Sequence, residues 1–224
     1  MLQSWHQLLF AHWRVSRNVL RPLIPAQLRL DEFDGSAWVG LTPFRIVGLR
    51  ARFLPPLPGV SSFPELNLRT YVRFGDTPGI YFFTLEAASL PAVIAARALY
   101  HLPYRHAEMT VHRTNDWIAY RSRRRKGNAA FAARYRPHGE PFHAVAGTVE
   151  HFLTERYALY TVDDEGRVLR GDVHHAPWPL QLAEAEVETN TITAAHGIER
   201  PREAPLLHYS EKLDTLLWRL KRVG

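Results

Sequence analysis

The strongest constraint on the fold is the alternation of side chains between Phe63 and Val72. In an extended strand, successive side chains point to opposite faces of the sheet. One face of this segment would carry Leu66, Leu68, Thr70 and Val72, and the other would carry Glu65, Asn67, Arg69 and Tyr71. Solvent usually selects lysine, glutamate, threonine and serine rather than a carboxylate, an amide, a guanidinium and a phenol together. The polar face of this strand is therefore predicted to line a site.

Length and composition narrow the class of protein. A chain of 224 residues that is 46% hydrophobic can bury one substantial core, so we expect a single domain over residues 1–224. The absence of cysteine excludes disulfides, thiolate metal sites and cysteine nucleophiles. No apolar run is long enough to span a membrane, and the first residues lack the layout of a signal peptide. A cytoplasmic protein without a membrane partner is expected.

The net charge of +6 is a weak indication of a nucleic-acid partner. A basic balance attracts phosphate only when the charge is clustered, and the one cluster is residues 121–126, which read Arg-Ser-Arg-Arg-Arg-Lys. The apolar segment before it and Gly127-Asn128 after it predict a strand that ends in a turn. A solvated, edge-protecting strand end is favoured over a polyanion site.

Turn and cap residues predict the other elements. Asp34-Gly35 supplies the positive φ angles of a tight turn, so 28–33 and 36–41 are predicted to pair as a hairpin. Ser16 is a candidate N-cap for a helix over 17–23, Pro91 suits the first turn of a helix ending at Tyr100, and 50–62 is predicted to be a loop. A meander of strands is predicted over 109–113, 117–124, 129–136, 148–153, 157–162 and 167–174. Segments 8–15, 180–191 and 212–222 fit either a helix or a strand.

Six motifs occur in a fixed order along the chain. They are residues 9–13, 34–39, 63–72, 79–83, 102–104 and 153–157. Together they resemble the YqjF-like family of uncharacterised bacterial proteins, domain of unknown function 2071, whose fold is similar to that of acetoacetate decarboxylase. The resemblance implies an α+β, β-rich fold: a cone-shaped antiparallel β-barrel with a few short helices and a small-molecule cavity.

The same resemblance excludes the best-known chemistry of that fold. Acetoacetate decarboxylase carries a Gly-x-Pro-Lys-Lys turn, and the matching turn here reads Leu-Pro-Tyr-Arg-His over 102–106. The Schiff-base lysine would fall on Tyr104 or Arg105. A Schiff base needs a neutral amine, whereas arginine stays protonated and tyrosine cannot form an imine. Lysine-dependent decarboxylation is therefore rejected, and the cavity is retained.

The barrel interpretation assigns candidate site residues. Glu65, Asn67, Arg69 and Tyr71 would line the inside, and Glu86, Arg97, Tyr104, Arg105 and His106 would lie near the mouth. The arginines would hold a carboxylate or phosphate, with Asn67, Tyr71 and Glu86 completing the substrate contacts. Glu65, His106 and Tyr104 are the candidate catalytic groups, as general acid or base. A buried network in which Arg69 pairs with Glu65 or Glu86 is an equally weighted alternative.

No cofactor is implied. His174 and His175 are adjacent in a predicted strand and point to opposite faces, which argues against a metal site. We therefore expect a protein that binds a small organic anion, catalysing acid-base chemistry of the lyase, hydratase or isomerase type without a cofactor. The alternative is a non-catalytic ligand-binding protein, and nucleic-acid binding through 121–126 ranks third. The sequence leaves a homo-oligomer open.

Overall fold

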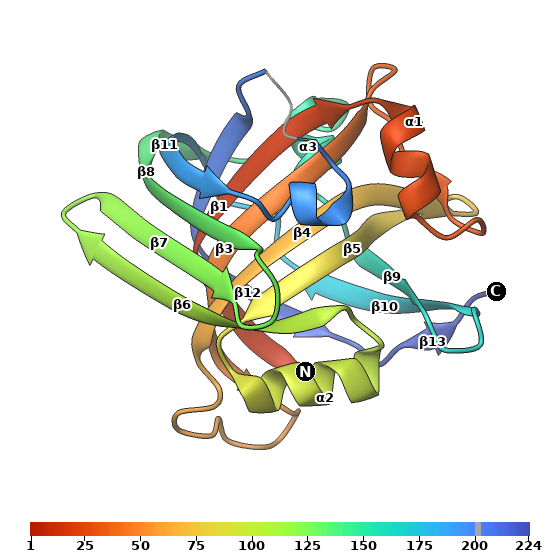
Figure 1. The fold of residues 1–224 in the computed structure, drawn as a ribbon, viewed down its shortest axis with the longest axis horizontal. Helices are drawn as coiled ribbons and strands as arrows, with labels where there is room; N and C mark the ends of the chain where they lie inside the picture. The colour runs from red at the N-terminus through yellow and green to blue at the C-terminus, as the bar shows by residue number, and fades with distance from the viewer. Residues whose placement is uncertain (200–202) are drawn as a thin grey trace.

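The computed structural model describes residues 1–199 and 203–224, and strands dominate it (Figure 1). The strands are β1 (Leu2–Val15), β2 (Arg29–Leu30), β3 (Ala37–Arg50), β4 (Phe63–Phe74), β5 (Thr77–Ala87), β6 (Tyr104–Thr114), β7 (Trp117–Arg124), β8 (Ala130–Phe142), β9 (Ala158–Val162), β10 (Val168–His175), β11 (Leu180–Asn190), β12 (Leu206–Leu217) and β13 (Lys221–Arg222). The helices are α1 (Arg17–Leu20), α2 (Leu90–Tyr100) and α3 (Val149–Thr154), with short 3₁₀ turns at Arg21–Leu23 and Ala194–His196. Within the described residues, no helix is long and apolar enough to cross a membrane.

The strand pairings close into two rings that share one wall. The shared wall is β12-β1-β3-β4-β5. The two outermost strands of this wall are β5 and β12, and each of them pairs with two further strands. One end of β5 pairs with β6 and the other end pairs with β9, whereas β12 pairs with β11 and with β10. The larger ring continues through β6, β7, β8 and β11, and the smaller ring continues through β9 and β10. The pairings are antiparallel except those of β5 with β6 and β9.

Because the wall is shared, its strands are buried on both faces. In β4, Leu66, Leu68 and Val72 pack into the apolar core of the larger ring, whereas Glu65, Asn67 and Arg69 line a cavity in the smaller one. The sequence alternation over 63–72 is therefore the pattern of a strand between two interiors, because each set of alternate residues enters a different ring. The predicted strand and the inward direction of its polar face are confirmed.

Close packing across the wall requires glycine at position 40. A Cβ added to Gly40 would lie 2.8 Å from Cδ2 of His12 and 3.4 Å from the Tyr71 hydroxyl. The missing side chain therefore leaves room for a buried pair, in which the Tyr71 oxygen lies 2.7 Å from Nε2 of His12. Glycine inside a strand commonly marks such a close approach.

Local signals correctly predicted several elements. Ser16 accepts a hydrogen bond from the Asn18 backbone nitrogen at the start of α1, and Ser89 does the same for Ala92 at the start of α2. The segment 50–62 is a loop between β3 and β4. The three ambiguous segments, 8–15, 180–191 and 212–222, belong to strands β1, β11, β12 and β13, with irregular turns between them.

The predicted hairpin is correct only in its turn. Asp34 and Gly35 adopt positive φ angles of 51° and 69°, and the backbones of Phe33 and Ser36 exchange hydrogen bonds. However, β2 pairs with β4 instead of β3. Both edges of β3 are already occupied at this level, by β1 and by β4, so no edge of β3 remains for β2.

The predicted strand over 148–153 is wrong, because this segment forms helix α3. The side chain of Thr148 accepts a hydrogen bond from the His151 backbone nitrogen and caps the helix. As a result, the meander is interrupted: β6, β7 and β8 are consecutive antiparallel neighbours, but β9 pairs with β5 and β10.

A buried ion pair fixes the junction of β5 and β7 inside the larger ring. Nε of Arg124 donates to Glu86 at 3.0 Å, and Thr84 donates to the same carboxylate at 3.0 Å. The Glu86 side chain has no exposed surface, and that of Arg124 is 13% exposed. A buried carboxylate that loses its cation is strongly destabilising.

We expect Arg124→Ala to lower the free energy of unfolding by about 3–5 kcal/mol, because Glu86 would remain buried without its partner. Urea denaturation measures this change. Arg123→Ala is the matched control, since Arg123 is exposed and pairs with the exposed Glu108, and it should leave the denaturation midpoint nearly unchanged. Equal effects of the two substitutions would contradict this account of the junction.

Candidate functional site

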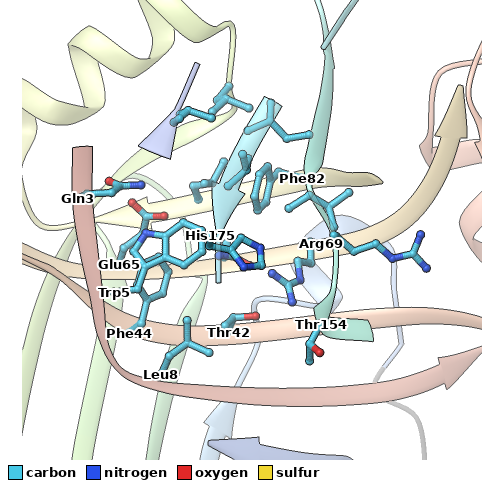
Figure 2. A pocket seen from close by; sticks show the side chains of 18 of the residues that line it. Gln3, Trp5, Leu8, Thr42, Phe44, Glu65, Arg69, Phe82, Thr154 and His175 are labelled. Atoms are coloured by element: carbon cyan, nitrogen blue, oxygen red, sulfur yellow. The ribbon is translucent and has the colours of Figure 1, made fainter. Parts of the chain in front are cut away.

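The smaller ring surrounds a cavity of about 70 Å³. We call it the small-ring cavity. Figure 2 shows Glu65 toward the end that holds Gln3 and Trp5, and Arg69 toward the end that holds Thr154. Its walls are largely apolar and aromatic, with a few polar groups, as is typical of small-molecule sites.

A bulge in β1 lets residues on both sides of it face the cavity. Gln7 has a positive φ of 53°, and the pairing of β1 with β3 is irregular between His6 and Ala11. The extra residue shifts the alternation by one position. Trp5 before the bulge and Leu8 after it therefore both line the cavity.

Arg69 is a buried guanidinium without a carboxylate partner among the described residues. Its Nη2 donates to the carbonyl oxygen of Leu153 at 3.5 Å, at the C-terminal end of α3. Its cationic carbon lies 5.3 Å from the ring centre of Phe10 and 5.9 Å from that of Tyr71. The predicted alternative, an ion pair of Arg69 with Glu65 or Glu86, is absent from the described structure. Buried charges are normally paired, so Arg69 is suited to a bound anion.

Several buried polar atoms around the cavity have no protein hydrogen-bond partner in the described structure. They are Nε1 of Trp5, Oγ1 of Thr42, Oδ1 of Asn67 and Nε of Arg69. Most buried polar atoms in proteins are hydrogen-bonded. These four atoms include both donors and an acceptor beside the cavity, so they are available to a bound ligand.

The carboxyl group of Glu65 is buried in the cavity, and its surroundings favour the protonated form. The Tyr104 hydroxyl donates to its Oε2 at 2.8 Å. Burial raises the pKa of Glu65 to about 8, against the opposing effect of that hydrogen bond. Burial also raises the pKa of Tyr104 well above 10, so the phenol remains a donor. Glu65 is therefore a neutral acid near pH 7, as general acids in apolar sites are.

His175 also lines the cavity, and sequence reasoning missed it. Nδ1 of its ring lies 2.7 Å from the Ala176 carbonyl oxygen, which can only accept a hydrogen bond. Nδ1 therefore carries a proton, and in the neutral ring Nε2 is an acceptor. His174 is exposed. The available signal was the strand alternation, which places His175 on the same face as Val173, another cavity residue.

Tyr71 and Arg156 are buried next to the cavity and are held by hydrogen bonds and an ion pair to other parts of the protein. The Tyr71 hydroxyl donates to the Leu153 carbonyl at 3.0 Å, so the nearby His12 ring donates to the phenol oxygen. Burial, followed by the charge of Arg69, holds the pKa of His12 well below its ordinary value. Arg156 reaches the cavity, but its Nη1 is paired with Asp31 at 2.6 Å.

Four predicted residues do not reach this cavity. Leu85 faces it, so its neighbour Glu86 faces the larger ring. Arg105 is exposed, and His106 lies in a surface hollow with Ser122, because β6 belongs to the larger ring and its first residue, Tyr104, is the one that lines the cavity. Arg97 is exposed on the outer side of α2. The structure thus brings together Glu65, Asn67, Arg69 and Tyr104, with Tyr71 in a supporting position.

The basic run 121–126 is largely neutralised by local ion pairs. Arg121 pairs with Glu188 at 2.9 Å, and Arg123 and Arg125 both pair with Glu108, at 2.6 and 3.1 Å. Arg124 is occupied by Glu86. Three carboxylates thus face the five basic residues of the run, and Arg123 and Arg125 share one of them.

Two other kinds of site, an imine-forming lysine and a metal centre, can be checked against the residues of the structure. The three lysines of the chain, Lys126, Lys212 and Lys221, do not line it, so an imine-forming amine is missing there. Over residues 1–199 and 203–224, no three His, Asp or Glu side chains gather as metal ligands.

Sequence comparison establishes the family. The profile of a family of uncharacterized conserved proteins, domain of unknown function 2071, matches residues 2–214. The chain belongs to this family. The YqjF protein of Bacillus subtilis, itself described as uncharacterized, is 49% identical over 223 residues, which cover 99% of this chain and 92% of that protein.

Structural comparison confirms the acetoacetate decarboxylase-like fold. The enduracididine biosynthesis enzyme MppR, solved in complex with pyruvate, has a TM-score of 0.71 at 11% identity, covering 100% of this chain and 90% of that one. Acetoacetate decarboxylase from Legionella pneumophila has a TM-score of 0.65 at 12% identity, covering 100% and 87%. An acetoacetate decarboxylase-like enzyme from Sphingomonas wittichii has a TM-score of 0.64 at 15% identity, covering 100% and 93%. At these identities the likeness concerns the fold alone.

The raised pKa of Glu65 predicts how stability depends on pH. Between the ordinary value of 4.5 and about 8, the unfolded chain releases this proton while the folded chain keeps it. The free energy of unfolding should therefore fall as pH rises through this window and level off above it. Relative to Glu65→Gln, the wild type should lose about 1.4 kcal/mol per pH unit in this window. Urea denaturation of both proteins between pH 5 and 9 measures the difference, and parallel pH profiles would refute it.

Proposed function

We propose that this protein binds a small organic carboxylate in the small-ring cavity and catalyses proton transfer on it without a cofactor. The observation that carries the proposal is Arg69, a buried cation without a carboxylate partner among the described residues, in the same cavity as the protonated acid Glu65. An anion that binds Arg69 supplies the missing charge. Glu65 remains available for chemistry because Tyr104, and not Arg69, is its partner.

The residues support an enolisation-type reaction. Arg69 holds the carboxylate of the substrate, and Asn67 adds a polar contact from the same strand. Glu65 donates its proton to a carbonyl oxygen of the substrate, while Nε2 of His175 takes a proton from the carbon next to that carbonyl. The C–H bond breaks, an enol forms, and the two protein groups exchange their roles when the proton returns. This step underlies isomerase, hydratase and lyase reactions and needs no lysine.

A 2-oxo acid is the first substrate class to test. MppR, of similar fold, was solved with pyruvate. At 11% identity this likeness carries no activity across to the present chain, but it supports the choice of ligand. A 2-oxo acid also presents the two groups that the cavity matches, a carboxylate for Arg69 and a carbonyl oxygen for Glu65.

Binding of 2-oxo acids should depend on Arg69. We expect Arg69→Met to weaken the affinity for 2-oxobutanoate about 10- to 100-fold, because charge-assisted hydrogen bonds to the carboxylate are lost. Isothermal titration calorimetry measures the change. Arg73→Met is the control: it lies on the same strand and faces Asp31 outside the cavity, so it should bind as the wild type does. Equal loss in both variants, or no binding by the wild type, would reject the carboxylate site.

Catalysis is separated from simple binding by hydrogen exchange. In deuterated water, the protein should accelerate exchange of the protons on carbon 3 of 2-oxobutanoate, followed by NMR. Glu65→Gln should reduce this exchange at least about 100-fold while keeping affinity within a few-fold, because general acid-base groups contribute about that much to rate. Binding without accelerated exchange would instead establish the alternative, a non-catalytic ligand-binding protein.

A further inference from the structure

A second apolar space adjoins the small-ring cavity beneath helix α2. It has a volume of about 80 Å³, and we call it the α2 space. The two spaces share Gln3, Leu102, Tyr104 and Leu217 as lining residues. Figure 1 shows α2 lying across one end of the strands, and in Figure 2 the α2 ribbon lies near the Gln3 end of the cavity. The small-ring cavity and the α2 space therefore adjoin at these four residues.

Helix α2 turns Val93 and Tyr100 toward the core, as an amphipathic helix normally does with large apolar side chains. The α2 residues that line the space are Ala92, Ala95, Ala96, Leu99 and Tyr100, and Leu99 is 69% exposed. The three alanines leave more room in the space than larger side chains would. The same helix with larger inner residues would fill it.

Polar and apolar walls follow one another along strand β4. Arg69, Asn67 and Glu65 line the small-ring cavity, and Phe63 lines the α2 space. The strand thus runs from a cation that has no carboxylate partner in residues 1–199 and 203–224, past a proton donor, to an apolar compartment. From Arg69 to Phe63 it covers about 20 Å at roughly 3.3 Å per residue.

From this order we propose that the ligand is an amphipathic acid, with its carboxylate on Arg69 and an apolar chain that passes Glu65 and Tyr104 into the α2 space. This inference rests on the proposed carboxylate site and adds the chemical class of the rest of the ligand. Because the Arg69 side chain extends toward the ligand, the remaining length fits a linear acid of about eight to ten carbons, at roughly 1.3 Å per carbon along an extended chain of 1.5 Å bonds.

The test is a chain-length series. Linear 2-oxo acids of four, six, eight and ten carbons are titrated into the wild-type protein by calorimetry. Affinity should rise about three- to fourfold for each added methylene up to the length of the two spaces, because each buried methylene contributes about 0.8 kcal/mol. The four-carbon acid should bind only in the small-ring cavity.

A filling variant locates the chain. Ala96→Phe should remove the gain in affinity of the eight- and ten-carbon acids and leave the four-carbon acid within about twofold, because the added ring occupies the α2 space and not the Arg69 end. Ala98→Phe is the matched control: Ala98 is exposed on the same helix and does not line this space. It should preserve the full chain-length dependence. Unchanged binding of the four-carbon acid also shows that the filled variant is folded.

The outcomes separate this inference from the proposed function. If short acids bind with dependence on Arg69 but affinity does not rise with length, or if Ala96→Phe and Ala98→Phe behave alike, the inference fails and the carboxylate site stands. If no acid of any length binds, or if binding is independent of Arg69, both fail.

Discussion

The shared wall β12-β1-β3-β4-β5 is the constraint on which the rest of this structure depends. A sheet with one face in water can place its polar residues there without further cost. A wall between two rings has no such face, so each polar side chain on it must find a partner or serve a ligand. The apolar face of β4 fills the larger ring, and its polar face then supplies the walls of the smaller one.

Two buried carboxylates show how differently this demand is met. Glu86 has Arg124 and Thr84 as partners and is an internal support of the larger ring. Among the residues that the structure describes, the Glu65 side chain has only the Tyr104 hydroxyl as a partner, and its pKa rises to about 8. The cation that would neutralise Glu65 in an ordinary buried pair, Arg69, is instead four residues along the same strand and contacts the α3 end. Separation of the acid from the cation is what distinguishes this cavity from a structural ion-pair network.

Sequence reasoning succeeded where a signal is local or repeats along one element. The alternation over 63–72, the Ser16 cap and the proline at position 91 each predicted the observed element, and the alternation also identified three cavity residues. The family motifs predicted the fold class. Tyr104 was predicted as a site residue because it lies in the turn that matches the lysine-bearing turn of acetoacetate decarboxylase.

The failures concern information that is not local. The partner of β2 depends on which edges β3 has left free, and the bulge at Gln7 reverses the faces of β1 in a way that composition does not reveal. Glu86, Arg105 and His106 are close in sequence and in pairing to cavity residues, yet the face of β5 and the course of β6 along the larger ring decide their positions. The adjacent His174 and His175 suggest a metal site, whereas the strand alternation places His175 on the same face as Val173, a cavity residue.

The division of β4 into two sets of residues has an evolutionary consequence. The packing of the larger ring constrains its even-numbered positions, such as Leu66 and Leu68, while the lining of the small-ring cavity constrains odd-numbered ones, such as Glu65 and Arg69. Substitutions in one set need not be compensated in the other, because they contact different rings. A lineage built on this strand can therefore change the lining of the cavity while its folding core is inherited unchanged.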